Sequence, residues 1–248
     1  MAVFKDYSAY YDLLYQNKDY DAEADYVTSI IRKFNPEYQS ILEIGCGTGK
    51  HAASFSKLGF DVMGIDKSSR MIQIAKKNQP WLDFQIADIR YYDAYRKYDA
   101  VTALFHVISY LTTDDDLQKA INSISKSLRT GGIFVFDCWY GPAVLTDPPV
   151  PRLRIFENSC LLIRRKSIPE QDLSKDLVNV HFNVEVTRKG SDEKNCFTET
   201  HPMRYFFVPA IQQLCQSNNI EIVYSGEWMS GNSLSDKTWY ACFGGIKK

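Results

Sequence analysis

Three glycines spaced two residues apart, Gly45, Gly47 and Gly49, stand directly after a short apolar run at residues 41–44. The run predicts a buried parallel strand, and apolar residues at helical spacing begin again at Ala52. Glycine tolerates a positive φ and lets a ligand lie on the main chain. The start of a helix offers unpaired N–H groups to an anion. Strand, glycine loop and helix in this order predict the opening of a doubly wound α/β sheet that binds a nucleotide-like ligand.

Three ligand classes compete for such a loop, and spacing separates them. A P-loop needs four residues between its glycines, whereas three separate the outer glycines here, so that class is excluded. A dinucleotide fingerprint is met by Gly47, Gly49 and Ala52, with Asp66 near the distance of a ribose-binding acid. The third pattern, an acid followed by alternating glycines, begins at Glu43 and resembles the first motif of class I S-adenosylmethionine (SAM) methyltransferases. The loop alone leaves dehydrogenase and methyltransferase open.

Further polar residues follow the ends of the next predicted strands, where open α/β sheets bind their ligands. Asp66 can accept hydrogen bonds from both hydroxyls of a ribose. Asp88 can accept the amino hydrogens of an adenine against which Ile89 packs. Together with the segment Leu104–Leu111, these features resemble the class I SAM-dependent methyltransferase domain over residues 40–138. A dehydrogenase would not need Asp88, and it would need a hydride-transfer domain that the sequence does not reveal.

A narrower resemblance extends over most of the chain. The tyrosine-rich segment 7–20, the C-G-T-G loop, the segment 137–142 and the segment 199–206 are similar to nucleotide-linked aminosugar N,N-dimethyltransferases, which make sugars such as desosamine and mycaminose. The resemblance implies an inserted sheet that forms the acceptor site and a dimer contact. Residues 142–165 depart from the pattern, and they should shape the acceptor pocket.

The motifs and the resemblance imply roles for individual residues. We expect cofactor contacts from the arm, the glycine loop and the strand ends: Tyr11, Tyr20, Glu43, Gly45, Cys46, Gly47, Thr48, Gly49, His51, Asp66, Lys67, Met71, Asp88, Ile89, Arg90, Leu104 and Phe105. We expect catalytic roles for His106, His201 and Tyr11, because aromatic faces suit a sulfonium and a weakly nucleophilic acceptor needs a base. We expect Trp139, Tyr140, Glu199, His201 and Arg204 to bind the acceptor.

Composition excludes several classes of partner. The net charge is −1 over 248 residues without a strong basic run, so nucleic acid is not expected as the main partner. The triplet 164–166, Arg-Arg-Lys, is interpreted as a solvated strand end, although it could meet a phosphate. Six cysteines without a C-x-x-C pair predict reduced, buried thiols of a cytoplasmic protein, with no metal site. Neither a signal peptide nor a membrane span is expected.

The elements that position these residues alternate between strand and helix up to residue 141. Residues 1–36 are predicted to form two helices, either a lid over the ligand loop or a packing arm over a sheet edge. Residues 37–141 and 208–248 are predicted to form a Rossmann-like SAM-binding core with right-handed crossovers. Residues 142–207 are predicted to form an antiparallel sheet inserted after the fifth strand, as the acceptor and dimer region.

Three local predictions concern helix faces and ends. The second helix is expected to bury a stripe of Ala22, Tyr26, Ile30 and Phe34. A helix over residues 114–129 is expected to close at Gly131-Gly132. Four prolines within residues 142–152 predict a loop there.

From these features we expect a SAM-dependent enzyme that methylates a small molecule, most specifically the amino group of a nucleotide-linked aminosugar, and that forms a homodimer. The alternative is O-methylation of a sugar or another small metabolite. More distant alternatives are an NAD-binding dehydrogenase and a SAM-binding protein without catalytic activity.

Overall fold

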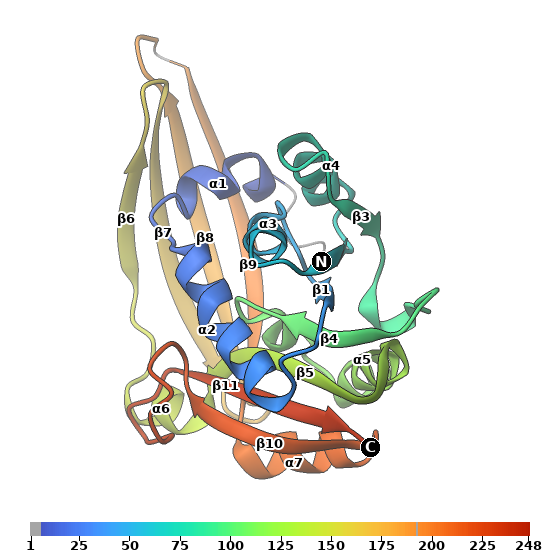
Figure 1. The fold of residues 1–248 in the computed structure, drawn as a ribbon. Coiled ribbons are helices and arrows are strands. Elements are labelled where there is room, and N and C mark those ends of the chain that lie inside the picture. Colours follow the sequence, from blue (N-terminus) through green and yellow to red (C-terminus); the bar gives the residue numbers. More distant parts are fainter. Residues whose placement is uncertain (1–5, 192) are drawn as a thin grey trace.

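The computed structural model describes residues 6–191 and 193–248, so residues 1–5 of the expected lid lie outside the described part (Figure 1). The strands are β1 Ser40–Ile44, β2 Asp61–Asp66, β3 Asp83–Ile86, β4 Tyr98–Ala103, β5 Leu128–Tyr140, β6 Arg152–Glu157, β7 Leu161–Asp172, β8 Leu177–Arg188, β9 Lys194–Phe206, β10 Ile220–Glu227 and β11 Tyr240–Lys247. The helices are α1 Tyr11–Leu14, α2 Tyr20–Phe34, α3 Lys50–Lys57, α4 Ser69–Asn78, α5 Asp114–Ser127, α6 Gly141–Thr146 and α7 Val208–Gln216, with 3-10 turns η1 Tyr7–Tyr10, η2 Ile89–Tyr91 and η3 Val107–Tyr110.

The core sheet confirms the predicted doubly wound α/β class. Its strands run in the order β3-β2-β1-β4-β5 and are all parallel. Strand β11 adds antiparallel to β5, and β10 adds antiparallel to β11. The order reverses between β1 and β4, because the chain first builds outward to β3 and then returns to the other side of β1. Such a switch point opens a crevice at the carboxyl ends of the strands, where ligands bind.

Helices cover both faces of this sheet because successive strand residues point to opposite sides. On one face, Ile133 and Val135 of β5 join the apolar residues of α2, α3 and α4. On the other face, Phe134 and Phe136 join those of α5 and α7. Strands buried on both sides read as continuous apolar runs, and these runs are what made the core recognisable in the sequence.

The segment between β5 and α7 forms a long antiparallel sheet that stands beside the core (Figure 1). Strands β6 to β9 pair in sequence order. The sheet joins the core where β9 lies parallel to the end of β5, with Trp139 opposite Tyr205 and Tyr140 opposite Phe206. The end of β5 therefore belongs to both sheets, and it fixes the inserted sheet next to the crevice.

The N-terminal arm packs between the two sheets. Tyr7 and Leu14 are buried against Ile163, Val184 and Val186 of the inserted sheet. Such packing of aromatic and aliphatic side chains supplies most of the stability of a short helix, because α1 is too short to persist alone. The arm is thus held against the inserted sheet on one side, and its polar residues face the glycine loop on the other.

The buried face of α2 differs from the prediction. Asp19 caps the helix by accepting a hydrogen bond from the backbone N–H of Ala22 at 2.9 Å. The core-facing residues are Ala24, Val27, Thr28, Ile30 and Ile31, while Phe34 is exposed. Of the predicted stripe, Ile30 is buried and Tyr26 packs against the edge of the core, whereas the prediction for Phe34 is wrong.

Two helix boundaries also differ. Helix α5 ends at Ser127, and Leu128 already begins β5, so Gly131, with a φ of 79°, lies inside the strand and does not cap the helix. Helix α6 occupies part of the predicted 142–152 loop, with Pro142 in its first turn. Proline is tolerated there because the first turn of a helix leaves its N–H groups unpaired. Strand β6 was also missed by the prediction.

Three general features complete the description. All six cysteines are free. Within residues 6–191 and 193–248, no group of three or more His, Cys, Asp or Glu side chains is arranged to hold a metal ion. In the same part of the chain, none of the helices combines the length and apolar character that a bilayer crossing requires.

Candidate active site

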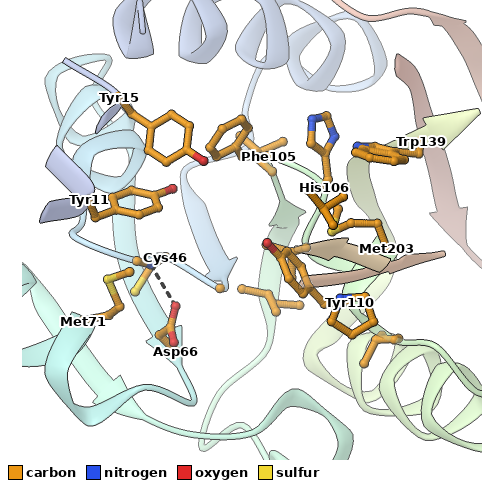
Figure 2. A pocket seen from close by; sticks show the side chains of 18 of the residues that line it. Tyr11, Tyr15, Cys46, Asp66, Met71, Phe105, His106, Tyr110, Trp139 and Met203 are labelled. Atoms are coloured by element: carbon orange, nitrogen blue, oxygen red, sulfur yellow. Dashed lines mark hydrogen bonds between the residues drawn. The ribbon is translucent and has the colours of Figure 1, made fainter. Parts of the chain in front are cut away.

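A cavity of about 890 Å³ opens at the carboxyl ends of β1, β2 and β4 and extends to the inserted sheet. Figure 2 shows Tyr11, Tyr15 and Asp66 toward one end of it and His106 and Trp139 toward the other. The cavity brings together most of the residues predicted from the sequence: Tyr11, Tyr20, Gly45, Cys46, Gly47, Thr48, His51, Asp66, Lys67, Met71, Asp88, Ile89, Arg90, Leu104, Phe105, His106 and Trp139.

The glycine loop has the backbone shape that only glycine tolerates well. Gly45, Gly47 and Gly49 have φ values of 63°, 54° and 78°, in the left-handed region that costs other residues roughly 1–2 kcal/mol. A Cβ at Gly45 would lie 2.5 Å from the side chain of Val107, and one at Gly49 would lie 2.7 Å from Phe84. A Cβ at Gly47 would meet no atom of the described residues within 4 Å. Gly47 therefore forms an open cradle for a ligand.

Asp66 closes the loop and faces the same cavity. Its Oδ2 accepts a hydrogen bond from the backbone N–H of Gly47 at 3.0 Å, and its Oδ1 accepts one from Ser68 at 2.8 Å. Burial raises the pKa of this carboxyl, while these two hydrogen bonds oppose the rise. Each oxygen keeps a free lone pair, so Asp66 can still accept the hydroxyls of a bound ribose.

Asp88 is held in a fixed position by Arg90. The Arg90 Nε donates to Asp88 at 2.9 Å, and its Nη1 donates to Asp116 at 2.8 Å. Hydrogen bonds from Arg90 lower the pKa of Asp88 below its usual range, so the group remains an ionised acceptor. The neighbouring Ile89 presents an apolar surface to the cavity. An acid beside an apolar wall fits the edge and the face of an adenine.

Aromatic rings from the arm and from the end of β4 form the wall between the two ends of the cavity. The rings of Tyr11 and Tyr15 lie 4.7 Å apart, and Tyr15 meets Phe105 edge-on at 5.0 Å. Phe105 also receives the ammonium group of Lys18 over its face at 4.2 Å. The hydroxyl of Tyr20 is buried and has no hydrogen-bond partner among the described residues. This wall can accommodate a cation, and the Tyr20 hydroxyl remains available to a ligand.

Polar contacts tie the arm to the glycine loop. Thr48 donates a hydrogen bond from Oγ1 to Asp12 at 2.8 Å. His51 Nε2 lies 2.8 Å from Glu23 Oε2, and Glu23 in turn pairs with Lys18. Burial lowers the pKa of His51, while the hydrogen bond with Glu23 opposes this effect. Hydrogen bonds and ion pairs therefore connect the N-terminal arm to the glycine loop at the end of the cavity where Tyr20 lies.

His106 and Asp137 form a close pair at the other end. The His106 Nδ1 lies 2.6 Å from Asp137 Oδ2, although the ring N–H is not aligned with that oxygen. The backbone N–H of His106 also donates to both Asp137 oxygens at 3.2 Å. Tyr240 stacks on the imidazole, with ring centroids 4.5 Å apart. The second ring nitrogen, Nε2, has no hydrogen-bond partner among the described residues. An imidazole oriented by a carboxylate can accept a proton.

Several predicted site residues do not reach the cavity wall: Glu43, Gly49, Tyr140, Glu199, His201 and Arg204. Glu43 lies buried beneath the glycine loop, with its Oε1 3.7 Å from His51 Nδ1. Arg204 instead pairs with Asp114 at 2.7 Å. These residues lie on the same strands and loops as cavity residues. Their side chains point away from the cavity, because successive residues of a strand face opposite sides of the sheet and the loops turn the others outward.

His201 approaches the cavity only through a second residue. Its Nδ1 lies 2.8 Å from the Tyr110 hydroxyl, and its Nε2 lies 3.1 Å from Glu199 Oε1. The predicted pairing of His201 with Glu199 is therefore present. Tyr110, which belongs to the predicted segment Leu104–Leu111 but was given no role of its own, lines the cavity in place of the histidine.

Other cavity residues were also missed from the sequence. Tyr15 lies one helical turn after Tyr11, and that spacing was a usable signal. Arg152 and Arg154 lie on a strand that was not predicted. Arg165 was interpreted as part of a solvated strand end, yet it is only 7% exposed and lines the cavity. The alternation of apolar and polar residues along the inserted strands indicated that the sheet has two different faces, but not which face packs against the core.

Comparisons with known proteins agree with this site. The methyltransferase domain family matches residues 41–132. The dTDP-3-amino-3,4,6-trideoxy-alpha-D-glucopyranose N,N-dimethyltransferase of Streptomyces venezuelae is 29% identical over 231 residues, which cover 92% of this chain and 96% of the relative. The crystal structure of DesVI from Streptomyces venezuelae superposes with a TM-score of 0.84 and 25% identity, covering 98% of this chain and 99% of that one.

A third comparison concerns the fold. SAM-bound CalS10, an amino pentose methyltransferase from Micromonospora echinaspora, has the same fold, with a TM-score of 0.79 at 21% identity over 100% of this chain and 99% of that one. The open cradle at Gly47, the acceptor Asp66 and the unpartnered Tyr20 hydroxyl fit a bound SAM. The chain therefore carries a methyltransferase domain at residues 41–132, and along almost its whole length it is similar to an N,N-dimethyltransferase.

Proposed function

We propose that this enzyme transfers methyl groups from SAM to the amino group of a nucleotide-linked aminosugar. The observation that carries the proposal is a continuous cavity that joins the glycine loop to His106 and the inserted sheet. A donor and an acceptor bound at its two ends would meet near Phe105. The full-length similarity to an aminosugar N,N-dimethyltransferase supports this choice of acceptor.

SAM, when bound, supplies a methyl group on a sulfonium, whose leaving thioether needs no protonation. The protein's task is therefore to position the two partners, which is worth several kcal/mol in a displacement reaction. Asp66 and Asp88 are placed to orient the nucleoside, and Gly47 leaves room for it. The rings of Tyr11 and Phe105 can stabilise the positive charge next to the acceptor.

An amine acceptor must be neutral to react, and its nitrogen loses a proton for each methyl gained. His106 can take up that proton at Nε2 while Asp137 stabilises the charge that forms on the imidazole. Tyr110, braced by His201 and Glu199, offers a second polar group on the same wall. In this proposal His201 and Glu199 position Tyr110 and do not touch the acceptor themselves.

A sugar hydroxyl is the second candidate acceptor. The close contact between His106 and Asp137 favours it, because deprotonation of a hydroxyl needs a base that an amine can do without. The two candidates share the donor site and differ only in the acceptor atom.

We further propose that the enzyme acts in the cytoplasm, to which its six free cysteines are suited, and that it forms a homodimer. In this proposal, residues 1–36 form the lid, residues 37–141 and 208–248 bind SAM, and residues 142–207 hold the acceptor and the dimer contact. Analytical ultracentrifugation would test the dimer, and a single monomeric species would contradict it.

A matched pair of sugar nucleotides tests the acceptor. One carries an amino group and the other a hydroxyl at the same carbon, and each is incubated with SAM and the enzyme. We expect mass spectrometry to find one and then two added methyl groups on the amino compound and none on the hydroxyl compound. Methylation of the hydroxyl compound alone would contradict the proposal and favour O-methylation.

A further inference from the structure

Three arginines gather on the face of the inserted sheet that lines the cavity. Arg152 and Arg154 lie two residues apart on β6 and share that face. On the neighbouring strand β7, Arg165 lies directly opposite Arg154, and Ser167 lies opposite Arg152. All four residues line the cavity. Guanidinium groups therefore cover the cavity wall where β6 and β7 pair.

The pairing of Arg154 with Arg165 places two positive charges opposite each other. Like charges in direct cross-strand pairs destabilise a sheet, so a ligand with negative charge would relieve the repulsion. Arg154 is exposed, whereas Arg165 is 7% exposed. The rings of Phe156 and Phe182 lie 5.1 Å and 5.0 Å from the Arg165 guanidinium, so the pair combines a cation held in place with an exposed one.

The charges of these arginines are not neutralised by acidic side chains of residues 6–191 and 193–248. No carboxylate among the described residues forms an ion pair with Arg152, Arg154 or Arg165, whereas Arg90 and Arg204 each have one. Arg165 donates from Nη1 to the neutral hydroxyls of Tyr7 and Tyr15, and its buried Nε meets no hydrogen-bond partner in the described part of the chain.

The arginines lie beside the wall where transfer is proposed. Burial, and to a lesser extent the charge of Asp137, raise the pKa of the Tyr240 phenol. The positive charges of Arg154 and Arg152 lower this pKa, so these arginines act on Tyr240. Tyr240 stacks on His106. The carboxylates that line the cavity instead belong to Asp66 of β2, Asp88 just before η2 and Asp116 of α5. The donor end of the cavity thus carries both acidic and basic side chains, including Lys50, Lys67 and Arg90, whereas arginines line the acceptor end.

We propose that Arg152, Arg154 and Arg165 bind the diphosphate of the nucleotide-linked acceptor, an inference that rests on the proposed function. The forked guanidinium matches phosphate oxygens with paired hydrogen bonds. Residues two apart on a strand are separated by roughly 7 Å, and long arginine side chains that start at this spacing can converge on the oxygens of one diphosphate. Holding the diphosphate at β6 and β7 would leave the sugar directed toward His106.

Calorimetric binding of thymidine diphosphate tests this assignment without any turnover. The variants are Arg152→Ala and Arg154→Ala, with Arg164→Ala as the matched control. Arg164 lies next to Arg165 on β7 and therefore points to the opposite face of the sheet, away from the cavity. Like the cavity arginines, it forms no ion pair with an acidic side chain of the described residues. We expect each cavity variant to weaken binding by about tenfold to hundredfold and the control to leave it unchanged. SAM affinity should remain the same in all three.

Two readouts separate this inference from the proposed function. Equal loss of thymidine diphosphate affinity in Arg154→Ala and Arg164→Ala, or no loss in either cavity variant, would overturn the diphosphate site. Methylation of an aminosugar nucleotide at an unchanged KM in both cavity variants would overturn it too, while the proposed function stands. Arginine-dependent binding of thymidine diphosphate without methylation of any aminosugar nucleotide would uphold the site and refute the proposed function.

Discussion

Replacement of Glu43 by glutamine should flatten the pH dependence of stability. Burial raises the pKa of Glu43 from its usual 4.5 to about 8, with a hydrogen bond from the backbone of Ala52 opposing this rise and Asp66 adding to it. The folded protein therefore binds this proton more tightly than the unfolded chain does. Stability from this group is full below about pH 4.5 and is lost as the pH rises toward about 8.

The size of the effect follows from the two pKa values. Each pH unit between them costs up to about 1.4 kcal/mol, so the full loss for Glu43 is roughly 5 kcal/mol, an upper limit because the site can relax. Glutamine has nearly the shape of the protonated acid and keeps an oxygen that can accept the Ala52 hydrogen bond. In Glu43→Gln this contribution to the free energy of unfolding should disappear.

Urea unfolding without SAM, followed by tryptophan fluorescence at about pH 5 and about pH 8, measures the difference. We expect the wild type to lose a few kcal/mol more than Glu43→Gln across this interval. Glu37→Gln, a change at an exposed site, serves as the control and should behave as the wild type. Asp66 also loses stability with rising pH, but it is present in every variant. Identical losses in the wild type and Glu43→Gln would refute the argument.

Three further changes probe the cavity. Gly47→Val should reduce SAM affinity by at least about tenfold, because the new side chain fills the space of the ligand. Gly59→Val is the control: it also lies at a positive φ in open space, but outside the cavity, and it should not reduce the affinity. Equal losses of SAM affinity in calorimetry would indicate backbone strain alone. Tyr20→Phe removes a buried hydroxyl that has no hydrogen-bond partner within the described ranges, so the free protein should gain about 1 kcal/mol of stability while SAM affinity falls severalfold. A lower melting temperature would contradict this. Asp137→Asn should lower kcat by about two orders of magnitude with little change in SAM affinity, and an unchanged kcat would remove Asp137 from the reaction.

The core and the donor end of the cavity were predictable from the sequence because local signals determine them. The apolar runs of parallel strands and the alternation with helices identified the sheet, and glycine spacing marked the loop. Asp66 and Asp88 follow the ends of neighbouring strands, so topology alone brings them together. These signals extend over a few residues each and need no knowledge of distant contacts.

The acceptor end depends on register and on distant contacts, which the sequence does not show. Strand β6 follows several prolines and is mostly exposed, so Arg152 and Arg154 gave no strand signal. His201 carries the expected pairing with Glu199, but the placement of η3 beside β9 inserts Tyr110 between it and the cavity. The contact between Tyr110 and His201, which lie far apart in the sequence, therefore determines that the tyrosine and not the histidine reaches the ligand.

Transfer of an isotope-labelled methyl group from SAM to a nucleotide-linked aminosugar tests the central claim most directly. NMR of the product distinguishes methyl groups on nitrogen from methyl groups on oxygen. We predict that the label appears on the sugar nitrogen, first once and then twice, and that His106→Ala slows its arrival. Label on oxygen, or no transfer by an enzyme that binds SAM, would contradict the account.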